Sequence, residues 1–169
     1  MSDKPVVGIL MGSASDLPVM QEASKILSEF GVAYEMLVTS AHRSPRRTRE
    51  YVEKVVERGL KILIVGAGGA AHLGGVVAAE TTLPVIGVPI DSSALKGLDA
   101  LLATVQMPAG IPVATMAIGS AGARNAGVLA VEILALGDAS LQRKLVDYRK
   151  KLADDVERSS KQLQGGSGL

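Results

Sequence analysis

Residues 38–47, VTSAHRSPRR, combine groups suited to proton transfer and to anion binding. His42 is one of two histidines in the chain, and because imidazole exchanges protons near neutral pH it is a candidate general acid/base. Spacing alone also allows His42 a structural, hydrogen-bonded role. Cations near a helix start oppose the helix dipole, so we expect Arg43, just before the helix, to bind an anion such as phosphate. For Arg46 and Arg47 we expect a solvated face or a subunit contact.

A second candidate turn, MGSASD at residues 11–16, follows an apolar run and precedes a helical pattern. Gly12 permits a tight turn, and Ser13 and Ser15 offer hydroxyl groups. The free N–H groups of the following helix can receive an anion, while Asp16 could accept a hydrogen bond from a sugar hydroxyl. Capping of the helix by Ser15 or Asp16 is the simpler interpretation, and it accounts for part of the motif.

The third turn, GAGGAAHLGG at residues 66–75, is built almost entirely from small residues. Such a turn can bring backbone N–H groups against a flat ligand or an anion. It contains His72, the second histidine. Both histidines therefore follow predicted strands and should lie at the same edge of the sheet.

A competing interpretation of the third turn is a dinucleotide site. Gly66, Gly68 and Ala71 match G-x-G-x-x-A, and Asp91 after the next strand could contact a ribose. This would make the chain a nucleotide-binding or sensory module rather than an enzyme. The motif lies on the third strand–helix unit, however, and the chain lacks the second mononucleotide-binding half of a full dinucleotide domain.

The elements that must position these turns form an α/β pattern. Five apolar runs, VVGIL, YEMLV, KILIVG, PVIGVP and PVATMAI, alternate with helical patterns, which predicts a parallel sheet with right-handed crossovers. The first helix should end at Gly31. The second should begin at Pro45 with Ser44 as N-cap, end at Gly59, and carry Arg46–Glu50 and Arg49–Glu53 pairs. A third helix should follow His72. A fourth should occupy part of residues 94–106, and a fifth should run through residues 122–137.

A last helix, predicted at residues 138–162, is charged except for one apolar stripe. The stripe comprises Leu141, Leu145, Tyr148, Leu152 and Val156. An amphipathic stripe does not name its partner, so it could pack on its own domain or on a neighbouring subunit. We expect residues 1–163 to form a single domain and residues 164–169 a flexible tail.

Composition excludes several classes of protein. The 169 residues are 47% hydrophobic and 21% charged, as in a globular domain. A net charge of +1 and few aromatic residues predict neither nucleic-acid nor membrane binding. The absence of cysteine excludes disulfides and thiolate sites. The first apolar run is too short for a signal segment, so we expect a cytoplasmic protein.

Taken together, the motifs MGSASD, SAHRSP, GAGGAAHLGG, PVIGVPIDSSALKGLDALLATVQMPAGIPVATMAIG and AGARNAGVLAVEIL resemble the class I N5-carboxyaminoimidazole ribonucleotide mutases of bacterial purine biosynthesis. The resemblance implies a flavodoxin-like three-layer sandwich, an octamer whose C-terminal helix reaches a neighbour, and carboxyl transfer from nitrogen to carbon C4 without metal, ATP or biotin. A related class II branch uses free CO₂, but the glycine-rich turn here resembles that of the mutases.

The resemblance also implies roles for individual residues. His42 matches the general acid/base, and Arg43 matches a residue near the substrate phosphate. The other positions implied to bind substrate are Gly12, Ser13, Ser15, Asp16, Ser40, Ala41, Gly68, Ala70, His72 and Leu73.

Overall fold

The computed structural model describes residues 4–165 and contains a parallel five-stranded sheet in the order β2-β1-β3-β4-β5. This is the flavodoxin-like strand order, and it confirms the predicted fold class. The last strand is much shorter than the apolar run that predicted it. The strands are β1 (Val7–Met11), β2 (Tyr34–Val38), β3 (Ile62–Gly68), β4 (Val85–Ile90) and β5 (Ala114–Thr115).

Helices follow each strand, as predicted. The first is preceded by a short 3₁₀ turn, and Gly31 ends it in the left-handed conformation, with φ of 73°. The elements are η1 (Ala14–Asp16), α1 (Leu17–Phe30), α2 (Pro45–Val52), α3 (Leu73–Ala79), α4 (Leu98–Val105), α5 (Ser120–Ala135) and α6 (Ala139–Gly165).

The second helix is shorter than predicted. It begins at Pro45 but ends at Val52, and residues 53–59 form tighter turns, with Val55 N–H donating to the Val52 carbonyl. Val55 within these turns is completely buried and belongs to the same core cluster as Val52. Of the two predicted surface pairs, Arg46–Glu50 forms, whereas Arg49 pairs with Glu80 instead of Glu53.

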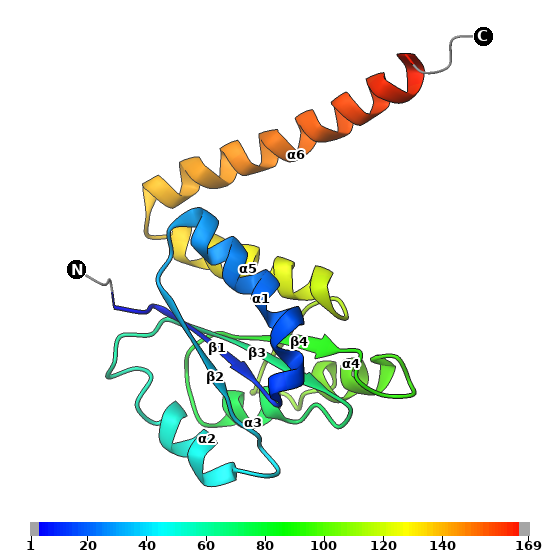
Figure 1. Ribbon diagram of the computed structural model, residues 1–169. Coiled ribbons are helices and arrows are strands. Elements are labelled where there is room, and N and C mark those ends of the chain that lie inside the picture. The colour runs from blue at the N-terminus through cyan, green and yellow to red at the C-terminus, as the bar shows by residue number, and fades with distance from the viewer. Residues whose placement is uncertain (1–3, 166–169) are drawn as a thin grey trace. The chain divides into compact units, whose positions relative to one another are not determined.

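The sheet divides the core into two layers, which Figure 1 shows as helices on opposite sides of the strands. Alternate side chains of β3 face opposite sides. Leu63 and Val65 belong to the cluster with α2 and α3, whereas Gly66 faces α1, where an added Cβ would overlap the side chain of Met20. Helix α5 packs close to α1, since a Cβ on Gly127 would lie 2.9 Å from the Ile26 Cβ.

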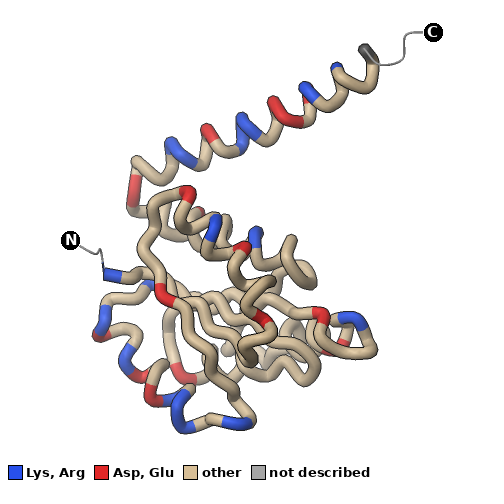
Figure 2. The backbone as a smooth tube through the Cα atoms, viewed as in Figure 1, with Lys and Arg blue, Asp and Glu red and all other residues tan. Residues whose placement is uncertain are grey.

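The chain forms two compact units, one ending at Val131 and the other beginning at Glu132. The second unit contains α6, whose start is fixed by Asp138, because the Asp138 carboxylate accepts a hydrogen bond of 2.8 Å from Ser140 N–H. The helix confirms the predicted one. Figure 2 shows that Lys and Arg positions alternate with Asp and Glu positions along this helix. The expected single domain stays a prediction, and residues 166–169 of the expected tail lie outside the described residues.

Within residues 4–165, no helix is both long and apolar enough to cross a membrane.

Candidate active site

A pocket of about 290 Å³ lies at the carboxyl edge of the sheet, where the turns after β1, β2, β3 and β4 meet. In open parallel sheets this edge is the usual ligand site. The structure brings together every residue predicted for the site except His72, which does not line the pocket but contacts His42. The lining residues are Gly12, Ser13, Ser15, Asp16, Ser40, Ala41, His42, Arg43, Ala67, Gly68, Ala70, Leu73 and Ser92.

The turn after β1 is held by a reciprocal capping arrangement. Ser13 N–H donates to the Asp16 carboxylate at 3.0 Å, and the Ser13 hydroxyl accepts from Ser15 N–H at 3.3 Å. The predicted caps, Ser15 and Asp16, are thus replaced by Ser13, which caps η1, while Asp16 makes no side-chain cap bond to α1. Asp16 therefore has a structural partner as well as a place in the pocket.

Burial dominates the electrostatics of Asp16, whose exposed fraction is 4%. It raises the pKa of the carboxyl group, against the opposing effects of hydrogen bonds from Ser13 and Ser15 and of the positive charge on Arg43.

Arg43 ties the turn after β2 to the turn after β1. Its guanidinium donates to the Gly12 carbonyl at 2.8 Å and to the Ser40 hydroxyl at 3.4 Å. This places a fixed positive charge beside Ser13 and Asp16, where a phosphate can also meet the first N–H groups of the helix. In contrast, Arg46 points away, with 91% of its side chain exposed, and pairs with Glu50.

The two histidines are in direct contact. His42 Nε2 lies 2.9 Å from His72 Nδ1, and the rings meet edge to face, with centroids 5.0 Å apart and an interplanar angle of 78°. One of these two nitrogens must donate and the other accept, so a single proton lies between the rings. The sequence predicted both rings at one edge of the sheet, and the structure adds that each is the other's partner.

Three glycines at the end of β3 and in the turn after it are each explained by their own surroundings. A Cβ on Gly66 would overlap Met20, and a Cβ on Gly68 would overlap Ser92. Gly69 adopts a positive φ of 59°. Asp91 does not line the pocket. Packing and turn geometry thus account for the glycines that suggested a dinucleotide motif.

Ser92 is a pocket residue that the sequence interpretation missed. It follows β4 by two residues, so the rule that ligands bind beyond strand ends could have identified it had it been applied to the fourth strand.

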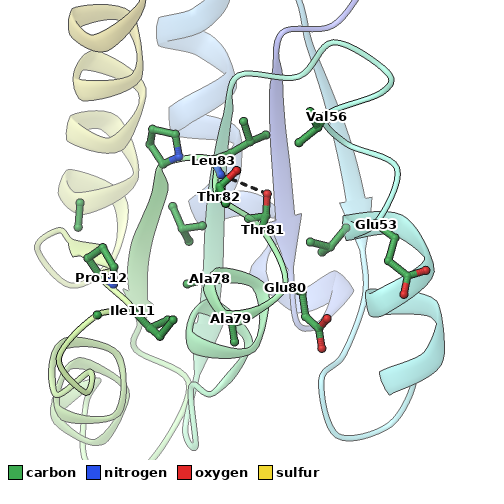
Figure 3. A pocket seen from close by; sticks show the side chains of 15 residues that line it. Glu53, Val56, Ala78, Ala79, Glu80, Thr81, Thr82, Leu83, Ile111 and Pro112 are labelled. Carbon is green, nitrogen blue, oxygen red and sulfur yellow. Dashed lines mark hydrogen bonds between the residues drawn. The ribbon is translucent and has the colours of Figure 1, made fainter.

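A larger hollow, of about 930 Å³, lies at the opposite, amino edge of the sheet. Figure 3 shows Leu83, Ile111 and Pro112 along one part of it and the carboxylates of Glu53 and Glu80 along another. Its lining contains no histidine, lysine or arginine, so an anionic substrate and a proton carrier fit the smaller pocket better.

The fold and pocket define the chain as an α/β protein with a pocket at the carboxyl edge of a flavodoxin-like sheet. A family model described as AIR carboxylase matches residues 6–155, and the chain belongs to that family.

Curated relatives sharpen the comparison. The chain is 56% identical over 163 residues to the N5-carboxyaminoimidazole ribonucleotide mutase of Pyrococcus horikoshii, covering 96% of this chain and 91% of the relative. It is also 56% identical over 160 residues to the mutase of Bacillus subtilis, covering 95% and 99%. A solved structure of Treponema denticola PurE is 27% identical with a TM-score of 0.85, covering 94% and 98%.

Proposed function

We propose that the protein converts N5-carboxyaminoimidazole ribonucleotide to 4-carboxy-5-aminoimidazole ribonucleotide, an isomerisation in purine biosynthesis. The observation that carries this proposal is the pocket itself. It combines His42, Arg43 and a glycine-rich turn in a chain more than half identical to enzymes named for this reaction.

The reaction needs two proton movements that balance. The exocyclic nitrogen gains a proton as its bond to the carboxyl carbon breaks, which releases CO₂. Carbon C4 of the aminoimidazole then attacks CO₂, and the C4 proton leaves. We assign both movements to His42, because one imidazole can donate its proton to the exocyclic nitrogen and later, in its neutral form, accept the proton that leaves C4. No metal or other cofactor takes part in this scheme.

The remaining pocket residues bind and orient the substrate. Arg43, Ser13, Ser15 and the N–H groups that follow hold the phosphate, which supplies binding energy far from the reacting atoms. Asp16 accepts a hydrogen bond from a ribose hydroxyl. The turns that surround the heterocycle retain CO₂ between the two steps. They contain the pocket residues Ser40, Ala41, Gly68, Ala70 and Leu73, together with His72, which contacts His42.

The direct test supplies purified protein with the N-carboxylated nucleotide, without ATP or bicarbonate. We expect the C4-carboxylated product, followed by its ultraviolet absorbance or by chromatography. No conversion would contradict the assignment. Dependence on bicarbonate, with no use of the N-carboxylated nucleotide, would instead indicate a CO₂-using carboxylase. Tight binding of NAD or FMN without turnover would indicate a nucleotide-binding module.

The assembly and location belong to the same proposal. We assign the protein to a homo-oligomer, an octamer by its family resemblance, in which α6 docks on a neighbouring subunit. Support comes from the stripe of α6, where Leu152 is 45% exposed and Val156 is 70% exposed. A cytoplasmic location follows from the substrate, because a charged phosphorylated nucleotide does not cross a lipid bilayer readily.

A further inference from the structure

The hydroxyl group of Ser92 occupies a place that only a glycine at position 68 leaves open. An added Cβ on Gly68 would overlap the Ser92 hydroxyl and lie 2.8 Å from the Ser92 Cβ. The side chain of Ser92 therefore folds across the end of β3 and becomes part of the pocket wall. A larger residue at position 68 would push it out.

The other serine hydroxyls of the pocket are already engaged within the protein. The Ser15 hydroxyl donates to that of Ser13 at 2.8 Å, and the Ser40 hydroxyl accepts from Arg43 N–H at 3.1 Å. Within residues 4–165, no hydrogen bond involves the Ser92 side chain. Ser92 thus contributes to the pocket a donor and acceptor that no described protein group uses.

The next residue holds the loop in place. The Ser93 hydroxyl donates to the Asp99 carboxylate at 2.7 Å and accepts from Leu95 N–H at 3.2 Å. The bond from Ser93 lowers the pKa of Asp99, which keeps the carboxylate ionised as an acceptor. The two adjacent serines therefore have different roles. Ser93 fixes the loop, and Ser92 is presented to the pocket without having to stabilise the fold.

Strand order indicates which part of the substrate Ser92 can reach. Arg43 and Ser13 follow β2 and β1, at one end of the carboxyl edge, whereas Gly68 and Ser92 follow β3 and β4, farther along the same edge. If the phosphate lies beside Arg43, the heterocycle lies toward Gly68.

We propose that Ser92 is a substrate-binding residue whose hydroxyl hydrogen-bonds a polar group of the aminoimidazole half of the nucleotide. This inference rests on the proposed function. It adds a contact from the fourth strand to a site that the sequence motifs assign to the first three.

The test compares two probes in binding experiments, 5-aminoimidazole ribonucleotide and ribose 5-phosphate. Ser92→Ala should weaken binding of the nucleotide about threefold to tenfold, the effect of one neutral hydrogen bond, and leave ribose 5-phosphate unchanged. Ser93→Ala is the matched control. It should lower Tm by removing the bond to Asp99 but leave both affinities near those of the wild type. Arg43→Ala should weaken both probes.

Two outcomes would overturn the role of Ser92. One is unchanged nucleotide affinity in Ser92→Ala, and the other is an equal loss for both probes, which would place the hydroxyl at the ribose phosphate. Because the Ser92 side chain has no hydrogen-bond partner among residues 4–165, Tm should not change. Should Ser92→Ala fail to fold, Ser92→Cys, of similar volume but weaker donor strength, replaces it in the comparison. The two proposals can fail separately. Absence of mutase turnover in the wild-type protein would contradict the proposed function. If the wild type turns over normally, the affinities of Ser92→Ala alone test the role of Ser92.

A double-mutant cycle provides a second readout. Gly68→Ala should displace the Ser92 side chain and weaken nucleotide binding, and adding Ser92→Ala should then cost less than it does alone. Strictly additive losses would show that Gly68 and Ser92 contribute independently and would contradict the coupling between them.

Discussion

His42 is held by another imidazole, that of His72, at 2.9 Å. Either ring nitrogen can be the donor or the acceptor of this bond, depending on the tautomer of each imidazole. The proposed reaction requires a group that donates once and accepts once, so this partner suits the role assigned to His42.

Replacement of His42 by Asn should lower mutase turnover by about 100- to 10,000-fold, the usual contribution of a positioned general acid/base. Because His42 is exposed, Tm should stay close to that of the wild type. His72→Asn is the comparison. It should retain more activity, because His72 contacts His42 and does not line the pocket. Near-normal turnover of the His42 variant would remove this residue from the proposed chemistry.

Arg43 and Arg46, three residues apart, should respond differently to substitution. Arg43→Ala should raise KM for the nucleotide about 10- to 100-fold, because charge-assisted hydrogen bonds to phosphate are strong. Arg46→Ala loses only an exposed pair with Glu50 and should change KM by less than about twofold. Steady-state kinetics measures both, and equal effects would contradict the assignment of Arg43 to the phosphate.

Among the elements, α2 is tied to the edge strand β2 by a polar cluster of Tyr51, Glu35 and Arg58. The Tyr51 hydroxyl donates to Glu35 at 2.7 Å, and Arg58 pairs with the same carboxylate. Burial and the Glu35 bond raise the pKa of Tyr51, so its hydroxyl remains a donor across the working pH range. For Glu35, burial raises the pKa, but the bonds from Arg58 and Tyr51 outweigh it and leave the pKa below its ordinary value.

This cluster predicts a pH-dependent contribution to stability. A carboxyl group whose folded-state pKa is lowered stabilises the protein above its unfolded-state pKa and loses that contribution as pH falls through the folded-state value. The difference in unfolding free energy between wild type and Glu35→Gln should therefore be full at neutral pH and shrink below about pH 4.5, the ordinary value for Glu. Urea unfolding at a series of pH values measures it.

Asp16 supplies a comparison of opposite sign. Its folded-state pKa is raised, so its contribution is present below the ordinary value of 3.8 and is lost as pH rises through the folded-state pKa. The wild type should therefore lose stability relative to Asp16→Asn as pH rises over this range. The difference in unfolding free energy between wild type and variant should change with pH in opposite directions for Glu35→Gln and Asp16→Asn. A change in the same direction would contradict the electrostatic explanation of both.

For the whole molecule, the open question is what covers Leu152 and Val156, the exposed part of the apolar stripe of α6, since Leu141 at its start is already buried. A double variant, Leu152→Glu with Val156→Glu, should dissociate or shrink the proposed oligomer, because each substitution places a charge in a buried contact. Lys150→Glu is the control. It changes net charge by the same amount but lies on another face of the helix. Light scattering coupled to size exclusion measures the mass, and an unchanged mass in the double variant would show that the stripe makes no subunit contact.

Local sequence patterns predicted most of the strands and several helix ends. Continuous apolar runs placed β1 to β4 to within a few residues, and Gly31 and Pro45 marked helix ends through backbone preferences that operate in any context. Prediction was poorer where tertiary packing decides. Helix α2 gives way to turns after Val52 although the helical pattern continues, and Arg49 pairs with Glu80, which is distant in sequence.

The sequence by itself determined the residue types, the strand–helix alternation and hence the edge at which His42, Arg43 and the glycine-rich turn must gather, because parallel strands all end at the same side of a sheet. Only the tertiary structure decided which groups touch. It placed His42 against His72, Arg43 on Gly12 and Ser92 across Gly68. Those contacts join residues from different strands, and their distances depend on strand order and packing, which no local pattern encodes.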